Sequence, residues 1–157
     1  MGETARILIV DDDESIRKTL AAILEEEGYL VDTMENGKEA IKKSRIKSYN
    51  LALIDIRLPD MEGVKLLTAM KETIPRMIKI IITGYPSLQN TVTAVNKGAD
   101  AYLLKPLSID DVLKTVGEQL KKQQEGKKYS EEKVAKFIET CMGEQEEEKH
   151  VAPKTTP

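Results

Sequence analysis

The chain has 157 residues, of which 40% are hydrophobic and 32% charged, and its formal net charge at pH 7 is -3. This apolar share excludes wholesale disorder, and the slight acidic excess argues against a broad basic surface for nucleic acid. One cysteine and one histidine cannot form an internal disulfide or a cysteine-rich zinc site. We find no signal-peptide pattern, and no apolar run approaches the roughly 20 residues of a membrane span. We therefore expect a soluble, cytoplasmic, single-domain protein.

Five short apolar runs alternate with five segments of helical spacing. The first run, 7–10, is continuous and rich in β-branched residues, which predicts a strand that is buried on both faces. In chain order, the predicted strands are 7–10, 29–34, 51–54, 78–82 and 101–104, and the helical stripes fall at 16–24, 40–41, 64–70, 92–96 and 112–120. Asp13 and Ser108 stand where N-caps are expected, and Gly28 stands where a helix end favours positive φ.

This alternation predicts an α/β fold, a parallel sheet with helices on both faces. In such sheets, ligands bind beyond the carboxyl ends of the strands. Polar residues stand at four of these ends: Asp11 and Asp12 after the first strand, Asp55 after the third, Thr83 after the fourth and Lys105 after the fifth. We therefore expect their side chains to gather at one edge of the sheet.

The residues at this edge suit phosphoryl transfer. Three neighbouring carboxylates repel each other unless one is protonated or a cation holds them together. A small set of oxygen ligands suits Mg²⁺, which keeps several waters. A carboxylate such as Asp55 can then act as a nucleophile toward a phosphoryl group, while Lys105 neutralises phosphoryl oxygens and the Thr83 hydroxyl donates to one of them.

Four motifs together resemble those of receiver domains in two-component response regulators. They are VDD at 10–12, Asp55 with LPDMEG at 58–63, TGY at 83–85 and GADAYLLKPL at 98–107. The resemblance covers roughly residues 6–120, and we assign 1–124 to a receiver domain. It implies a flavodoxin-like, doubly wound five-stranded sheet with strand order 2-1-3-4-5.

The resemblance also implies a role for each site residue. Asp55 would accept a phosphoryl group from a histidine kinase or phosphotransfer protein, with Lys105 as the phosphate-binding lysine before a cis bond to Pro106. Thr83 and Tyr102 would form the switch pair. Mg²⁺ would be bound directly by the carboxylates of Asp12 and Asp55 and by the backbone carbonyl of Arg57. Asp11 would act mainly through water.

Phosphorylation would act as a switch for protein partners. It adds about -1.5 to -2 charges at one carboxylate. The face formed by the fourth helix, fifth strand and fifth helix would repack and bind a downstream protein or a second copy of the chain. The chain would be a phosphoacceptor regulator rather than an enzyme, limited to weak self-phosphorylation from small donors and autodephosphorylation. We expect no direct contact with nucleic acid or a membrane.

The last segment, 125–157, differs from the rest in composition. Residues 121–157 contain eight lysines and eight glutamates. Apolar residues recur at helical spacing after Ser130, which predicts a short amphipathic helix at about 130–142 and a disordered end beyond it. These residues are Val134, Phe137, Ile138, Cys141 and Met142. This helix would pack on the domain, bind a partner or a second copy, or fail to persist alone.

Two other functions stay open at this stage. An aspartate-nucleophile phosphatase has similar chemistry, but it needs a second aspartate two positions after the nucleophile, where this chain has Arg57. The chain could also be the receiver fragment of a longer DNA-binding or ATPase-type transcriptional regulator. The stretch from Thr83 resembles receivers that precede ATPase modules.

Overall fold

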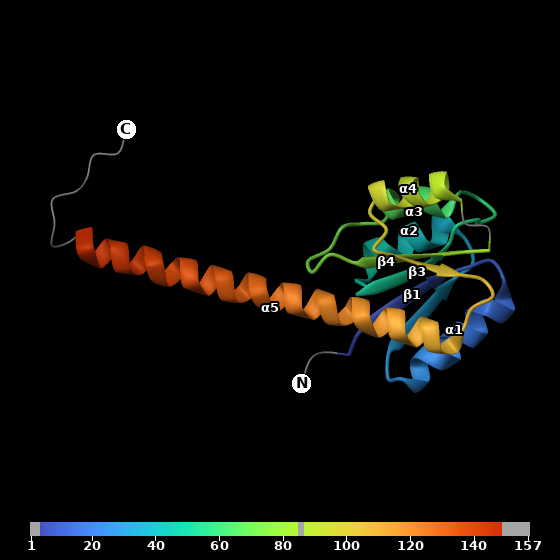
Figure 1. The fold of residues 1–157 in the computed structure, drawn as a ribbon, viewed down its shortest axis with the longest axis horizontal. Coiled ribbons are helices and arrows are strands. Elements are labelled where there is room, and N and C mark those ends of the chain that lie inside the picture. Colours follow the sequence, from blue (N-terminus) through green and yellow to red (C-terminus); the bar gives the residue numbers. More distant parts are fainter. Residues whose placement is uncertain (1–3, 85–86, 149–157) are drawn as a thin grey trace. The chain divides into compact units, whose positions relative to one another are not determined.

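The computed structural model describes residues 4–84 and 87–148 (Figure 1). Strands and helices alternate along these residues as the sequence predicts. In chain order they are β1 Arg6–Val10, α1 Glu14–Glu26, β2 Leu30–Met34, α2 Gly37–Ile46, β3 Leu51–Asp55, α3 Gly63–Ala69, β4 Ile78–Thr83, α4 Leu88–Asn96, β5 Ala101–Leu104 and α5 Ile109–Glu148. The chain divides into two compact units, Met1–Gln123 and Gln124–Pro157.

The five strands form one parallel sheet in the order β2-β1-β3-β4-β5. The order and the doubly wound α/β class predicted from the sequence are confirmed. The order reverses between β1 and β3, so the carboxyl ends of these strands form the switch point where ligands bind in open sheets. The register pairs Asp55 with Ile82, which brings the ends of β3 and β4 level.

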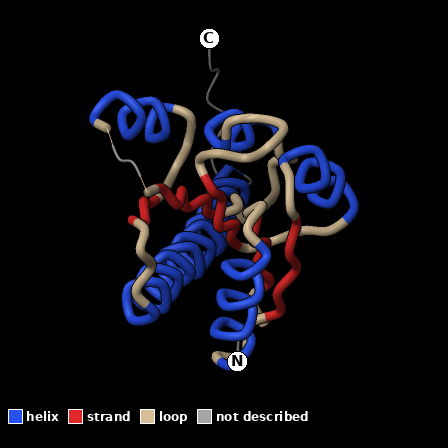
Figure 2. Tube along the Cα trace, turned by 90° about the vertical axis from the view of Figure 1, so that its right-hand side faces the viewer, coloured by secondary structure: helices blue, strands red, loops and turns tan. Residues whose placement is uncertain are grey.

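The core lies in two layers, one on each face of the sheet. Successive strand residues point to opposite faces, so each buried strand supplies both layers. Figure 2 shows the strands running between helices on both sides. One layer joins strand residues such as Leu8 and Ile54 to α2, α3 and α4. The other joins residues such as Ile9 and Leu53 to α1 and to the first turns of α5.

The predicted helix ends are confirmed by their hydrogen bonds and dihedral angles. The Asp13 side chain accepts a hydrogen bond from the Ile16 N–H at 3.2 Å and caps α1. Gly28 follows the same helix with φ at 94°, a value that favours glycine. Ser108 Oγ accepts from the Asp111 N–H at 3.4 Å at the start of α5. These caps fix where each helix leaves the sheet edge.

Gln123 ends the first unit with a buried set of hydrogen bonds. Its Nε2 donates to the carbonyls of Asn50, at 3.0 Å, and Arg76, at 2.8 Å. Its Oε1 accepts from the Asn50 side chain at 3.3 Å. Only 7% of Gln123 is exposed. One side chain thus ties α5 to the segments that lead into β3 and β4.

The second unit contains the last part of α5. The helical turns that we expected at about 130–142 belong to this longer helix, which continues to Glu148. Residues 143–148, which we expected to be disordered, are helical, because their glutamates and glutamine favour helix. Residues 149–157 lie outside the described residues. Within 4–84 and 87–148, no helix is both long enough and apolar enough to cross a membrane.

Candidate functional site

Three aspartates meet at the carboxyl edge of the sheet. Asp11 and Asp12 follow β1, and Asp55 is the last residue of β3. One carboxylate oxygen from each lies within 4.8 Å of the others. Asp11 and Asp55 are buried, whereas Asp12 is exposed. The two neighbouring strands therefore bring these carboxylates together, as the sequence predicts.

Asp11 is buried with one oxygen unsatisfied. Its Oδ1 accepts a hydrogen bond from the Asp13 N–H at 2.9 Å. Its Oδ2 is also buried but accepts no hydrogen bond within the described residues. Burial, with a further contribution from the charge of Asp55, raises the pKa of Asp11 to about 6. A cation at this oxygen would offset the cost of burying the carboxylate.

Asp55 accepts two hydrogen bonds at the centre of the site. Its Oδ1 accepts from the Arg57 N–H at 3.1 Å, and its Oδ2 accepts from Lys105 Nζ at 3.1 Å. Lys105 Nζ also lies 3.8 Å from Asp11 Oδ2. Burial lowers the pKa of Lys105, but its hydrogen bond to Asp55 and the nearby carboxylates outweigh burial, so this pKa lies above its usual range. The lysine is therefore held as a cation between two carboxylates.

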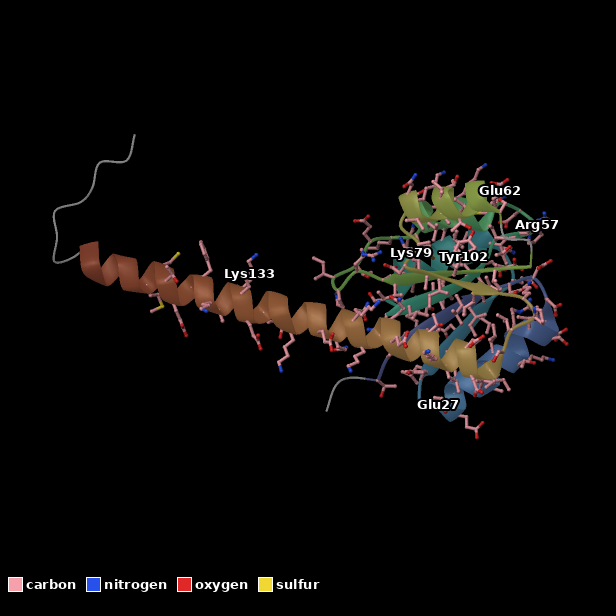
Figure 3. All side chains as sticks on the ribbon, in the orientation of Figure 1. Glu27, Arg57, Glu62, Lys79, Tyr102 and Lys133 are labelled. Atoms are coloured by element: carbon pink, nitrogen blue, oxygen red, sulfur yellow. The ribbon has the colours of Figure 1, made fainter. Side chains whose placement is uncertain are left out.

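The loop after Asp55 is fixed by a close backbone approach at Gly63. The Gly63 N–H donates to the Ile56 carbonyl at 2.7 Å. A Cβ at Gly63 would lie 2.2 Å from the Asp55 carbonyl oxygen, so only glycine fits here. Arg57 and Glu62 form an isolated antiparallel bridge across the loop, and Figure 3 labels both residues. The loop therefore holds the backbone beside Asp55 in one conformation.

Asp60 connects the same loop to α2. Its two carboxylate oxygens accept from the backbone N–H groups of Gly37 and Lys38, both at 2.9 Å. The hydrogen bond from Gly37 contributes most to lowering the pKa of Asp60 below its usual range. Burial raises this pKa, but the bonds from Gly37 and Lys38 together outweigh burial. A Cβ on Gly37 would lie 2.4 Å from Met61 Sδ, so the methionine packs over the start of α2. The loop next to Asp55 is thus anchored at a helix N-terminus.

Thr83 and Tyr102 belong to the same face of the sheet. The register pairs Tyr102 with Ile81, and Thr83 lies two residues after Ile81. Thr83 is buried. Tyr102 is partly buried against the core layer of α2, α3 and α4, and its hydroxyl oxygen is buried without a hydrogen-bond partner in the described residues. Figure 3 shows Tyr102 on the sheet. Their switching role stays a prediction.

The peptide bond between Lys105 and Pro106 is cis, as predicted. The backbone N–H of Lys105 donates to the Thr83 carbonyl at 2.8 Å, next to the last β4–β5 pair. Lys105 therefore extends from the end of β5 toward Asp55 at the end of β3.

The oxygen ligands fit a hard divalent cation. Three carboxylates can each offer one oxygen, and the buried, unsatisfied Oδ2 of Asp11 lies among them. Such a ligand set suits Mg²⁺ better than a transition metal, because it contains no nitrogen or sulfur. The site can therefore hold a metal ion.

The sequence did not predict the contacts that Arg17 and Asp60 make at the site. Arg17 Nη1 donates to the Asp11 carbonyl at 2.7 Å, and no local pattern marks this arginine. Asp60 lies within the motif at 58–63, but its partners on α2 are 22 and 23 residues away. Only the folded chain brings these residues to the site.

The sheet order and the acidic edge define a flavodoxin-like α/β protein with three aspartates at the switch point of its sheet. The family model of the response regulator receiver domain matches residues 7–117. The chain belongs to this family of two-component signalling domains.

Curated relatives and solved structures agree with this assignment. The transcriptional regulatory protein ZraR of Klebsiella oxytoca is 40% identical over 119 residues, which are 76% of this chain and 27% of that protein. The DNA-binding transcriptional regulator NtrC of Escherichia coli K12 is 37% identical over 119 residues, 76% of this chain and 25% of that protein. The chain thus spans about a quarter of the length of these relatives.

Two solved structures match nearly along their whole length. A CheY-like receiver domain protein from Methanospirillum hungatei JF-1 has a TM-score of 0.75 and 45% identity, covering 79% of this chain and 99% of that one. The beryllofluoride-activated NtrC4 receiver domain dimer has a TM-score of 0.70 and 40% identity, covering 75% of this chain and 98% of that one.

Proposed function

We propose that Asp55 accepts a phosphoryl group from the phosphohistidine of a histidine kinase or phosphotransfer protein. The observation that carries this proposal is the site itself: a buried carboxylate 3.1 Å from a lysine cation and within 4.8 Å of two further carboxylates. An Asp55 oxygen forms the new O–P bond while the donor's N–P bond breaks, and the imidazole leaves with the bonding electron pair. Lys105 then neutralises charge on the phosphoryl oxygens.

Mg²⁺ is the cofactor that we propose for this step. Asp12, Asp55 and the Arg57 carbonyl would bind it directly, and Asp11 would act mainly through water. When bound, the ion neutralises charge on the carboxylates and the incoming phosphoryl oxygens. The unsatisfied oxygen of Asp11 supports this assignment, because a cation would stabilise its ionised form.

The phosphodonor would dock in a groove beside Lys105. The groove has a volume of about 340 Å³ and lies between α1 and the β5–α5 connection. Its lining is mostly apolar and includes Ile16, Ile23 and Leu107, with Lys105 among the lining residues. A donor helix with an apolar face that is seated in this groove would lie next to the carboxylates. The partner that we infer is a cytoplasmic histidine kinase or phosphotransfer protein.

The output surface that we propose is the face of α4, β5 and the start of α5. It exposes four large apolar residues in the first unit: Val92 and Val95 on α4, Leu104 on β5 and Ile109 on α5. Phosphorylation would draw Thr83 toward the phosphoryl group and let Tyr102 repack beneath this face. A downstream protein or a second copy would bind it. The NtrC4 receiver, a structural neighbour, is described as a dimer.

Phosphoryl transfer from a protein donor tests the proposal. The wild-type chain should accept label from a phosphorylated histidine kinase core in the presence of Mg²⁺, and Asp55→Asn should accept none. Peptide mapping after hydroxylamine cleavage should place the hydroxamate at Asp55, because hydroxylamine attacks acyl phosphates. Label at another residue, or equal label on Asp55→Asn, would contradict the proposal.

The names of the curated relatives favour one refinement. ZraR and NtrC are described as transcriptional regulators. We therefore keep the proposal that this receiver serves a longer DNA-binding or ATPase-type regulator as the second candidate. A phosphorylation-dependent complex with such a regulator, or its presence on the same polypeptide in cells, would support this candidate over a stand-alone receiver.

A further inference from the structure

The second unit carries an exposed apolar stripe on α5. Four large apolar side chains within nine residues are between 52% and 69% exposed: Val134, Phe137, Ile138 and Met142. Cys141, the chain's only cysteine, is partly exposed on the same stretch. At about 3.6 residues per turn, their spacing places them on one side of the helix. An apolar stripe of this kind indicates a contact surface, because its burial would remove apolar area from water.

Charge is unevenly distributed on either side of the stripe's centre. Residues 124–136 contain four lysines and three glutamates, whereas 137–148 contain five glutamates and no basic residue. The last turn of α5 also lacks a basic residue. Glutamates near a helix C-terminus are unfavourable, because the helix dipole is negative there. A positively charged partner would therefore stabilise the acidic end.

A second copy running in the opposite direction satisfies both features. With a two-fold axis between Phe137 and Ile138, the apolar stripes of the two copies overlap, and Val134 lies opposite Cys141 of the second copy. Each lysine-containing half then faces an acidic half. Helical spacing puts Lys133 and Glu144 on the same flank of the helix, about three turns apart. In this register, Lys133 of one copy is therefore two positions from Glu144 of the second copy. Lys127 likewise lies opposite Glu148 of the second copy. A parallel pair would instead place like charges together.

We propose that residues 124–148 form an antiparallel helical pair with a second copy of this chain. Apolar packing at the centre supplies attraction, and the lysine–glutamate pairs set the direction. This contact is separate from the face of α4, β5 and the start of α5. It requires neither phosphate nor the site at Asp55, so its failure would leave the proposed function untouched.

Sedimentation equilibrium of the whole unphosphorylated chain tests this contact. We expect a concentration-dependent dimer, which Asp55→Asn retains. Phe137→Glu should weaken dimerisation at least about tenfold, as loss of a central aromatic anchor does in other interfaces. Thr140→Glu is the matched control, because it makes the same charge change at an exposed position that helical spacing puts away from the stripe, and it leaves all four lysines in place. Circular dichroism should show equal helix content in both variants. A monomer at every concentration, or a dimer that both variants leave unchanged, would overturn the proposal.

Charge exchange and cross-linking test the direction. Lys127→Glu with Lys133→Glu should weaken the dimer, and adding Glu144→Lys with Glu148→Lys should restore it. Under mild oxidation, the wild type should give little disulfide-linked dimer, because Cys141 lies away from its own counterpart. Val134→Cys should give abundant cross-linking to Cys141 of the second copy. Efficient cross-linking of the wild type, or no rescue by the exchanged charges, would overturn the antiparallel arrangement.

Discussion

Lys105 Nζ lies 3.1 Å from Asp55 Oδ2 and 3.8 Å from Asp11 Oδ2. One cation from the end of β5 thus contacts carboxylates from the ends of β3 and β1. This arrangement links Asp55, the proposed phosphoacceptor, to β5, which carries Tyr102 and Leu104 of the proposed output face. Because Lys105 directly follows β5, its ion pair with Asp55 connects the proposed phosphorylation site to that face.

Lys105→Ala should keep the fold but lose phosphorylation-dependent switching. Without the Lys105 ammonium, the phosphoryl group at Asp55 would have no ionic contact with the residue that follows β5. The buried carboxylates of Asp11 and Asp55 would also lose their cationic partner. We expect the free energy of unfolding without Mg²⁺ to fall by about 1–3 kcal/mol. NMR spectra with and without acetyl phosphate should show shifts near β5 in the wild type only. Lys114→Ala, an exposed lysine on α5, is the control. Undiminished shifts in Lys105→Ala would contradict this role.

Gly63→Ala should strongly destabilise the domain. The new Cβ would lie 2.2 Å from the Asp55 carbonyl, a backbone atom that cannot move aside cheaply. We expect a loss of about 2–4 kcal/mol in urea denaturation, with slower phosphorylation because Asp55 shifts. Gly117→Ala is the matched control. It has open space around a Cβ, lies within α5 and should be neutral or stabilising by up to about 1 kcal/mol. Equal stabilities for the two variants would refute the close-approach argument.

Gln123→Ala should loosen the end of the first unit. It removes two hydrogen bonds to the Asn50 and Arg76 carbonyls from a buried position. We expect a loss of about 1–3 kcal/mol in the free energy of unfolding. Hydrogen exchange should also accelerate in the neighbouring turns of α5. Gln124→Ala, the adjacent exposed glutamine, should change neither quantity. If both variants behaved alike, Gln123 would not hold the helix to the sheet.

Asp32 should make stability depend on pH in the acid range. Burial alone raises the pKa of its carboxyl, but hydrogen bonds from Tyr49 Oη at 2.6 Å and Lys47 Nζ at 2.9 Å outweigh burial and lower it. Because the pKa is lower in the folded state, this stabilisation is present above the unfolded pKa and is lost as the pH falls through the folded one.

The measurement is the difference in unfolding free energy between wild type and Asp32→Asn. The wild type should be the more stable of the two at about pH 6. This advantage should decline toward about pH 2, as the Asp32 carboxylate becomes protonated. Tyr49→Phe should reduce this decline because it removes one of the two hydrogen bonds. A difference that does not vary with pH would show that packing, rather than charge, makes Asp32 important.

The centre of the sheet was predictable because β1 and β3 are continuous apolar runs. Ile7 to Val10 and Leu51 to Ile54 are fully buried, so both faces of each strand read as apolar in the sequence. The carboxyl-end rule then places Asp11, Asp55 and Lys105 at one edge without knowledge of the family. Local sequence thus determines this part of the site, because each residue ends a strand or closely follows one.

Contacts made across the chain were not predictable. Arg17 binds the Asp11 carbonyl, and Gln123 reaches Asn50 from 73 residues away. Neither residue stands in a motif, because a surface arginine or a helix glutamine has no distinctive local pattern. The length of α5 was also missed. The sequence predicts a separate short helix at about 130–142, yet the lysines, glutamate and glutamines before it favour helix, so α5 continues through them.

Intact-mass spectrometry after incubation with acetyl phosphate and Mg²⁺ tests the central claim most directly. The wild type should gain one phosphoryl group, whereas Asp55→Asn and wild type with the metal chelated should gain none. Size-exclusion chromatography of the same samples would show whether the modified chain self-associates. No added mass on the wild type with Mg²⁺, or the same added mass on Asp55→Asn, would contradict the assignment of Asp55 as the phosphoacceptor.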